Sequence, residues 1–82
     1  MPLLLFHLIA DPGSARVRRT VTGRGLEAEV SFCNVAFDEA LAKLKSLGGS
    51  GAVPALWDGE RLFTGADAVI ARLLAHLDVG RS

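Results

Sequence analysis

Residues 3–19 read LLLFHLIADPGSARVRR and contain the transition that decides the fold. The run from Leu3 to Leu8 is almost wholly apolar, which is typical of a strand covered on both faces in an α/β sheet. Asp11 can accept hydrogen bonds from the first backbone N–H groups of a following helix, and Pro12 suits the first helical position. We therefore expect a central strand that leads directly into a capped helix.

The first helix is expected to be short and basic. Val17 and Val21 lie four residues apart on one face, and Gly23 and Gly25 are expected to end the helix. Most of the remaining surface belongs to arginines, at positions 16, 18, 19 and 24. We interpret them as a solvated face that balances nearby carboxylates, with phosphate or carboxylate binding as the sharper alternative.

A second strand is predicted from residue 27 onward. The stretch EAEVSF at 27–32 alternates polar and apolar residues, so one face, including Phe32, is expected to be buried and the other wet. Cys33 is then expected on the opposite side of the sheet, as an inert small hydrophobic residue. A helix between two strands of one sheet favours a parallel pair, which makes residues 3–34 a βαβ unit with an edge strand.

The second half of the chain predicts two more helices and a hairpin. Phe37, Ala40, Leu41, Leu44 and Leu47 recur at helical spacing, and the loop GGSG at 48–51 ends that helix. The segment VPALWDGERLF at 53–63 is typical of a hairpin with Asp58-Gly59 as a two-residue turn, both residues having positive φ. Thr64 and Asp67 resemble a capping box that opens the last helix.

Length, charge and cysteine content restrict the function. The 82 residues predict one domain, 1–79, with a frayed tail at 80–82, and too little chain for a deep cavity. Nine basic residues balance nine acidic ones, which argues against nucleic acid as the partner. A single cysteine and two separated histidines, His7 and His76, predict no disulfide and no metal site. The first apolar run is much shorter than the roughly 20 residues that span a bilayer, so we expect a cytoplasmic protein.

The predicted order βαβαββα resembles the glutaredoxin form of the thioredoxin fold, which is also the N-terminal domain of glutathione transferases. Three motifs carry the resemblance. Asp11-Pro12-Gly13-Ser14 stands where glutaredoxins have C-P-x-C, Ala52-Val53-Pro54-Ala55-Leu56 is similar to the V-P-x-L segment, and Phe63-Thr64-Gly65-Ala66-Asp67 is similar to the turn that holds the γ-glutamyl end of glutathione.

The resemblance implies both a fold and a ligand site. It implies an α/β fold in which a four-stranded mixed sheet is flanked by three helices, with a cis proline whose preceding backbone pairs with the cysteinyl part of glutathione. The ligand-binding residues that it implies are Asp11, Gly13, Arg16, Val53, Pro54, Gly65, Ala66 and Asp67.

Departures from the family pattern bear on activity. Neither Asp11 nor Ser14 can replace the attacking thiolate of a redox enzyme, so dithiol exchange is not expected. Of the residues at this junction only Ser14 could donate to a glutathione thiolate, which Asp11 would repel. In addition, Gly65-Ala66 replaces the Glu-Ser pair by which transferases grip the ligand.

Three functional hypotheses follow. The leading one is a non-redox module that binds glutathione, a related thiol peptide or a protein partner. The alternative is a glutathione-dependent transferase or isomerase in which Ser14 is catalytic, although Asp11 and Ser14 are explained more simply as a helix cap. The third, nucleic-acid binding by the arginine helix, lacks interleaved aromatic residues. The sequence leaves open the ligand, a homodimer, and whether a separate helical domain completes a transferase.

Overall fold

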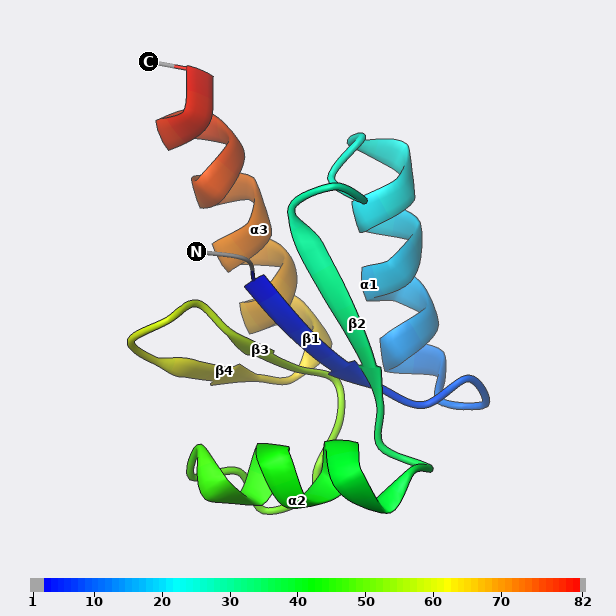
Figure 1. Cartoon of the computed structure of the whole chain (residues 1–82). Coiled ribbons are helices and arrows are strands. Elements are labelled where there is room, and N and C mark those ends of the chain that lie inside the picture. Colours follow the sequence, from blue (N-terminus) through cyan, green and yellow to red (C-terminus); the bar gives the residue numbers. More distant parts are fainter. Residues whose placement is uncertain (1–2, 82) are drawn as a thin grey trace.

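The chain folds into four strands and three helices around one mixed sheet (Figure 1). The computed structural model describes residues 3–81, with side chains described as far as residue 78. The elements are β1 (Leu3–His7), α1 (Pro12–Gly23), β2 (Val30–Asn34), α2 (Asp38–Ser46), β3 (Ala55–Trp57), β4 (Leu62–Thr64) and α3 (Ala66–Arg81). The strand order is β2-β1-β3-β4, with β1 parallel to β2 and antiparallel to β3, and with β3 antiparallel to β4. This confirms the predicted α/β class and is compatible with a thioredoxin-like βαβαββα arrangement.

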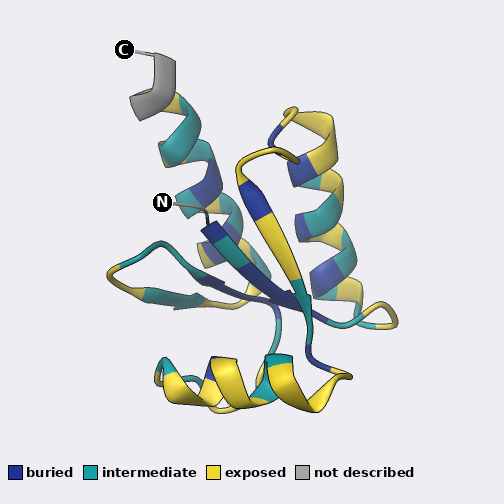
Figure 2. Cartoon of the chain, in the orientation of Figure 1, coloured by how far each residue is buried: buried dark blue, intermediate teal, exposed yellow. Residues whose placement is uncertain are grey.

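The two faces of the sheet carry separate buried clusters. On one face, termed the α1/α3 face, α1 and α3 pack against the sheet through Leu3, Leu5, Val17, Val21, Leu26, Val30, Leu56, Val69 and Leu73. On the opposite face, the α2 face, the buried residues are Phe6, Val35, Leu44 and Ala55. Strand β1 contributes to both clusters, which confirms that it is central and covered on both sides. Figure 2 shows that much of α2 is exposed.

Local signals at both ends of α1 agree with its bounds. Asp11 caps the helix through its carboxylate, and Pro12 is the first helical residue, as predicted. At the other end Gly25 has φ +67°, and the N–H of Leu26 donates to the carbonyl of Val21 at 2.9 Å. This is the hydrogen-bond pattern of a Schellman motif, in which a glycine takes the left-handed conformation and frees the chain to turn.

Two aromatic side chains are exposed: Phe32, which was predicted to face inward, and Phe37, which was grouped by helical spacing with apolar residues of the second helix. Phe32 on β2 is 44% exposed because β2 is the edge strand and residues 27–29 form a turn instead of extending it. Phe37 is 68% exposed because it precedes α2 with an extended backbone, which takes its side chain off the helix face. Cys33, in contrast, packs with the α2-face cluster, on the side of the sheet that was expected.

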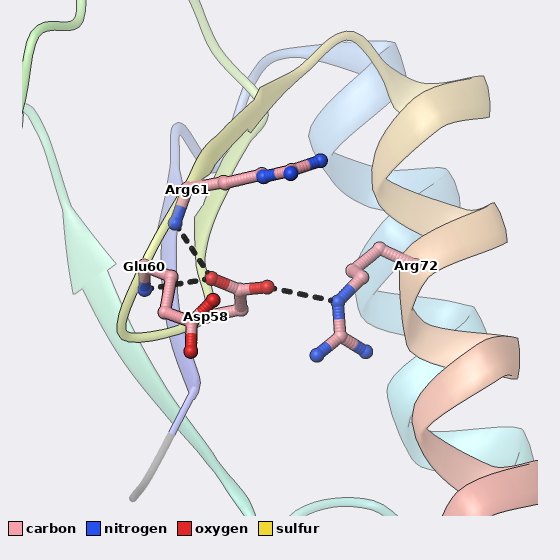
Figure 3. A network of polar contacts seen from close by, with 4 residues as sticks. All are labelled: Asp58, Glu60, Arg61 and Arg72. Atoms are coloured by element: carbon pink, nitrogen blue, oxygen red, sulfur yellow. Dashed lines mark hydrogen bonds and ion pairs between the residues drawn. The ribbon is translucent and has the colours of Figure 1, made fainter.

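The β3–β4 hairpin differs from the predicted two-residue turn. Trp57 pairs with Leu62, so four residues connect the strands, and Gly59 alone among them has positive φ. One oxygen of the Asp58 carboxylate accepts hydrogen bonds from the N–H groups of Glu60 and Arg61 at 2.8 and 2.7 Å. The other oxygen lies 3.1 Å from Nε of Arg72 on α3 (Figure 3). Asp58 therefore shapes the turn through its side chain and fastens it to α3.

The last helix also begins differently from the prediction. Thr64 belongs to β4, and Gly65, with φ +90°, supplies the carbonyl that accepts the N–H of Val69 at 3.0 Å. The Asp67 carboxylate pairs with Arg16 instead of closing a capping box with Thr64. At its other end α3 continues to Arg81, into the segment expected to be frayed, and Ser82 lies outside the described residues.

Candidate functional site

Three segments that are far apart in the sequence meet beyond the end of β1. A Cβ atom added to Gly13 would lie 3.1 Å from Cδ of Pro54 and 3.7 Å from Cβ of Ala66. The N–H of Gly65 donates to the carbonyl of Pro54 at 3.0 Å. The structure therefore brings together the segments around residues 13, 54 and 65, which the resemblance had assigned to one site. We call this group of residues the junction site.

Asp11 and Ser14 are occupied by contacts within the protein. The Asp11 carboxylate accepts the N–H of Ser14 at 2.7 Å, and the Ser14 hydroxyl accepts the N–H of Leu8 at 3.2 Å. Ser14 is 0% exposed. In this conformation a ligand cannot reach its hydroxyl, so the contacts fit the cap and loop-fixing role and not that of a catalyst.

The backbone of Val53 is the open part of the junction site. The peptide bond between Val53 and Pro54 is cis, and Val53 is half-buried. Within residues 3–81, neither the N–H nor the C=O of Val53 takes part in a backbone hydrogen bond outside the strand ladder, which begins only at Ala55. A backbone donor and acceptor on one residue can pair with the backbone of an extended ligand, as an added strand does.

The charged members of the junction site form an exposed pair. Nη2 of Arg16 on α1 lies 3.0 Å from Oδ1 of Asp67 on α3, and the Asp67 side chain is 92% exposed. Such a pair adds little stability because solvent screens it. The Asp67 carboxylate therefore remains accessible to a ligand ammonium group at the rim of the site.

Arg18 has a role that the sequence analysis missed. It donates to the carbonyls of Leu8 and Ile9 at 3.0 and 3.1 Å, so it holds the β1–α1 loop and is not a member of a solvated face. Its Nη1 also lies 3.2 Å from Nδ1 of the buried His7. Burial and then the Arg18 charge lower the pKa of His7, which favours a neutral imidazole that accepts from Arg18. No spacing rule links a strand histidine with an arginine eleven residues later.

Exposed apolar side chains lie at the same end of the sheet as the junction site. Ile9, 65% exposed, follows β1, and the exposed Phe37 follows β2. Because β1 and β2 are parallel, the loops that follow them leave the sheet at the same end, where both strands finish. The helical spacing had grouped Phe37 with the apolar residues of the expected helix, so its exposure was not predicted. Two large apolar side chains are therefore exposed at this end of the sheet.

Comparisons of the sequence with protein families and curated proteins identify no relatives. No protein-family model matches the chain, and no curated protein is significantly similar to it. The described part of the chain contains no group of three side chains able to hold a metal ion. Within residues 3–81, no helix combines the length and apolar character needed to cross a bilayer. Function is therefore inferred from the geometry of the junction site.

Proposed function

We propose that the chain binds an extended thiol peptide, glutathione or a close analogue, at the junction site without redox chemistry. The observation that carries the proposal is the unpaired backbone of Val53 beside the close contact of Gly13 with Pro54. The same groups would pair with an extended segment of a protein partner. The likeness to glutaredoxins and transferase N-terminal domains supports this choice of ligand class and is itself part of the proposal.

The surroundings of the junction site favour binding over catalysis. The Asp11 carboxylate lies 3.3 Å from the position of a Cβ on Gly13, so a thiolate bound there would meet a like charge. A bound thiol is therefore expected to stay protonated. Cys33, the only cysteine in the sequence, lies on β2 among α2-face residues, and burial raises the pKa of its thiol. Neither feature supplies the thiolate that exchange chemistry requires.

The alternative transferase mechanism needs the Ser14 hydroxyl to reach a ligand sulfur. That hydroxyl would first have to leave the N–H of Leu8 and emerge from complete burial. A conjugation assay with glutathione and an electrophilic aromatic substrate is expected to show no rate above that of the uncatalysed reaction. A rate that is present in the wild type and lost in Ser14→Ala would instead establish the transferase.

Titration followed by backbone amide shifts tests the binding proposal. Reduced glutathione and its S-methyl derivative are both expected to shift the amides of Gly13, Val53, Gly65 and Asp67, with similar affinity because the thiol is not ionised. Gly13→Val should abolish these shifts, because its side chain enters the contact with Pro54.

The matched control is Gly23→Val, in the same helix. Outside the helix's own backbone and the adjoining residues, no atom lies within 4 Å of a Cβ there, so this variant should bind as the wild type does. Absence of shifts with both ligands at millimolar concentration, or unchanged binding by Gly13→Val, would refute the proposal.

A further inference from the structure

A second surface, separate from the junction site, lies where α1 overhangs the edge of the sheet. It is an open groove of about 830 Å³ lined by Ala15, Arg18, Arg19, Thr22 and Gly23 of α1 and by Phe32 of β2. None of these residues belongs to the junction site. We call this surface the edge groove.

The backbone along the edge groove is that of an unpaired strand. The N–H of Leu3 donates to the carbonyl of Glu29, and the N–H of Val35 donates to the carbonyl of His7, both at 3.0 Å. Backbone groups alternate in direction along a strand, so the odd-numbered residues 29–35 face β1. The N–H groups of the even-numbered residues Val30, Phe32 and Asn34 therefore point outward, where a further strand could pair with them.

Side chains give the edge groove an apolar floor. Phe32 is 44% exposed, and its ring meets the His7 ring edge-on with centroids 5.5 Å apart. This contact fixes the ring beneath α1 while one side stays open to solvent. In Figure 2 the middle of β2 has the colour of exposed residues. An apolar side chain from an added strand would cover the open side of the ring.

The charge of the edge groove is positive. Arg18 is held by the carbonyls of Leu8 and Ile9, whereas Arg19 is exposed and forms no ion pair within the described residues. No acidic residue lines the groove. A carboxylate from an added strand would therefore meet an arginine and no like charge.

We infer that β2 binds an extended acidic segment of a partner protein, which adds to the sheet as a fifth strand. Its backbone pairs with the outward N–H groups of Val30, Phe32 and Asn34 and with the carbonyls of Val30 and Phe32, since the Asn34 carbonyl already accepts the N–H of Phe37 at 3.1 Å. One apolar side chain covers Phe32, and a carboxylate pairs with Arg19. This is β-augmentation, in which backbone bonds supply affinity and alternate side chains supply specificity.

A second copy of the chain fits the edge groove less well. Two identical edge strands that pair antiparallel are related by a two-fold axis perpendicular to the sheet, so both copies of α1 would lie on the same side. The Arg19 side chains would then approach one another along the interface. Like charges in that arrangement oppose self-pairing, whereas an acidic partner removes the repulsion.

The test uses a capped eight-residue peptide in which threonine alternates with leucine and glutamate, so that leucine and glutamate share one face. The control peptide has lysine in place of glutamate. The glutamate peptide is expected to shift the amides of Val30, Phe32 and Asn34, with an affinity that falls as salt rises. Arg19→Glu should weaken its binding at least tenfold and allow the lysine peptide to bind. Lys43→Glu, which makes the same change in charge on α2, should alter the affinity less than threefold.

Two variants at position 32 separate the contribution of the aromatic ring to binding from that of the backbone N–H. Phe32→Ala removes the ring and should weaken binding severalfold, and Phe32→Pro should abolish it because it also removes an outward N–H without breaking the β1 ladder. Equal binding of the two peptides, shifts outside β2 and α1, or no shifts would overturn the inference. Sedimentation of the free chain as a dimer with broadened β2 amides would also overturn it, in favour of self-pairing.

Discussion

The two faces of the sheet are stabilised in different ways. The α1/α3 face holds nine buried cluster residues, whereas the α2 face holds four. Among the described residues, ion pairs join Arg16 with Asp67 and Arg72 with Asp58, and Nε2 of His76 lies 2.9 Å from Oε1 of Glu29. All three contacts involve α3 and none involves α2. One side is therefore a layer with polar cross-links, and the other is a single helix held mainly by partly buried apolar side chains.

This difference bears on the proposed function. Stability varies within a structure, and regions with few buried contacts open first. The junction site draws Gly13 and Ala66 from the α1/α3 face, but Val53 comes from the connection that leads out of α2. A ligand at Val53 would therefore bind next to the least constrained part of the fold.

The largest expected effect comes from a matched pair of buried leucines. Leu73 on α3 and Leu44 on α2 are each 0% exposed. We expect Leu73→Ala to lower the free energy of unfolding by about 4 kcal/mol and Leu44→Ala by about 2.5 kcal/mol, because α2 can settle into the cavity more easily. Urea denaturation measures the free energy of unfolding of both variants. Equal losses, or a larger loss for Leu44→Ala, would contradict the difference between the faces.

The polar contacts of the hairpin should give the next largest effect. Backbone hydrogen bonds from Arg61 and Glu60, together with Arg72, lower the pKa of Asp58 to about 2, from an ordinary value of 3.8. A lowered carboxyl pKa stabilises the fold above the ordinary value, and this stability is lost as the pH falls toward about 2. We expect a loss of about 1 kcal/mol over that range, most of it from the two backbone hydrogen bonds, which are stronger to a charged carboxylate.

Two substitutions separate the contribution of the turn hydrogen bonds of Asp58 to stability from that of its ion pair with Arg72. Asp58→Ala removes both the turn acceptor and the ion pair and should cost about 2 kcal/mol at neutral pH. Asp58→Asn keeps an acceptor for the two N–H groups and should cost less than half as much. Both variants should lose the acid-dependent step in urea unfolding. If Asp58→Asn kept that step, another carboxyl group would be its source.

A smaller effect is expected from His7, on the α1/α3 face. Burial and Arg18 lower the pKa of His7 from 6.5, so the unfolded chain takes up this proton at a higher pH than the folded chain. Stability is therefore full above the ordinary value and falls as the pH drops through it toward the lowered one. We expect His7→Asn, compared in a His76→Gln background, to flatten this dependence. An unchanged slope in urea unfolding would exclude His7 as its source.

Parts of the fold were predictable from sequence where several neighbouring residues indicate the same element. Asp11, Pro12 and the valine spacing each indicate α1, and its bounds follow from them. Periodicity shows which residues share a face but not what covers that face. For this reason the exposure of Phe32 at the sheet edge, and of Phe37 outside α2, could not be read from spacing.

The candidate site was predictable only in part for the same reason. The resemblance placed residues 13, 54 and 65 at one site, and they lie together. Three contacts that define their surroundings are invisible to local patterns: Ser14 with Leu8, Arg18 with His7, and Asp58 with Arg72. Each joins elements that only the tertiary structure brings together, so the sequence could propose a donor at Ser14 but not show that it is buried.

The smallest expected effect on stability concerns the close approach of Gly13 on α1 to Pro54 in the loop that follows α2. Gly23→Ala, with no atom near the new Cβ, should stabilise the fold by about 0.5–1 kcal/mol through helix propensity. Gly13→Ala gains the same propensity but meets Cδ of Pro54 at 3.1 Å, so the loop from α2 must move by a few tenths of an ångström. If that loop moves at little cost, as the partial burial of the α2 contacts implies, Gly13→Ala should leave the free energy of unfolding nearly unchanged. Amide exchange in α2 should then be faster than in the wild type. A loss above about 2 kcal/mol would mean that the α2 side is as rigid as the α1/α3 face.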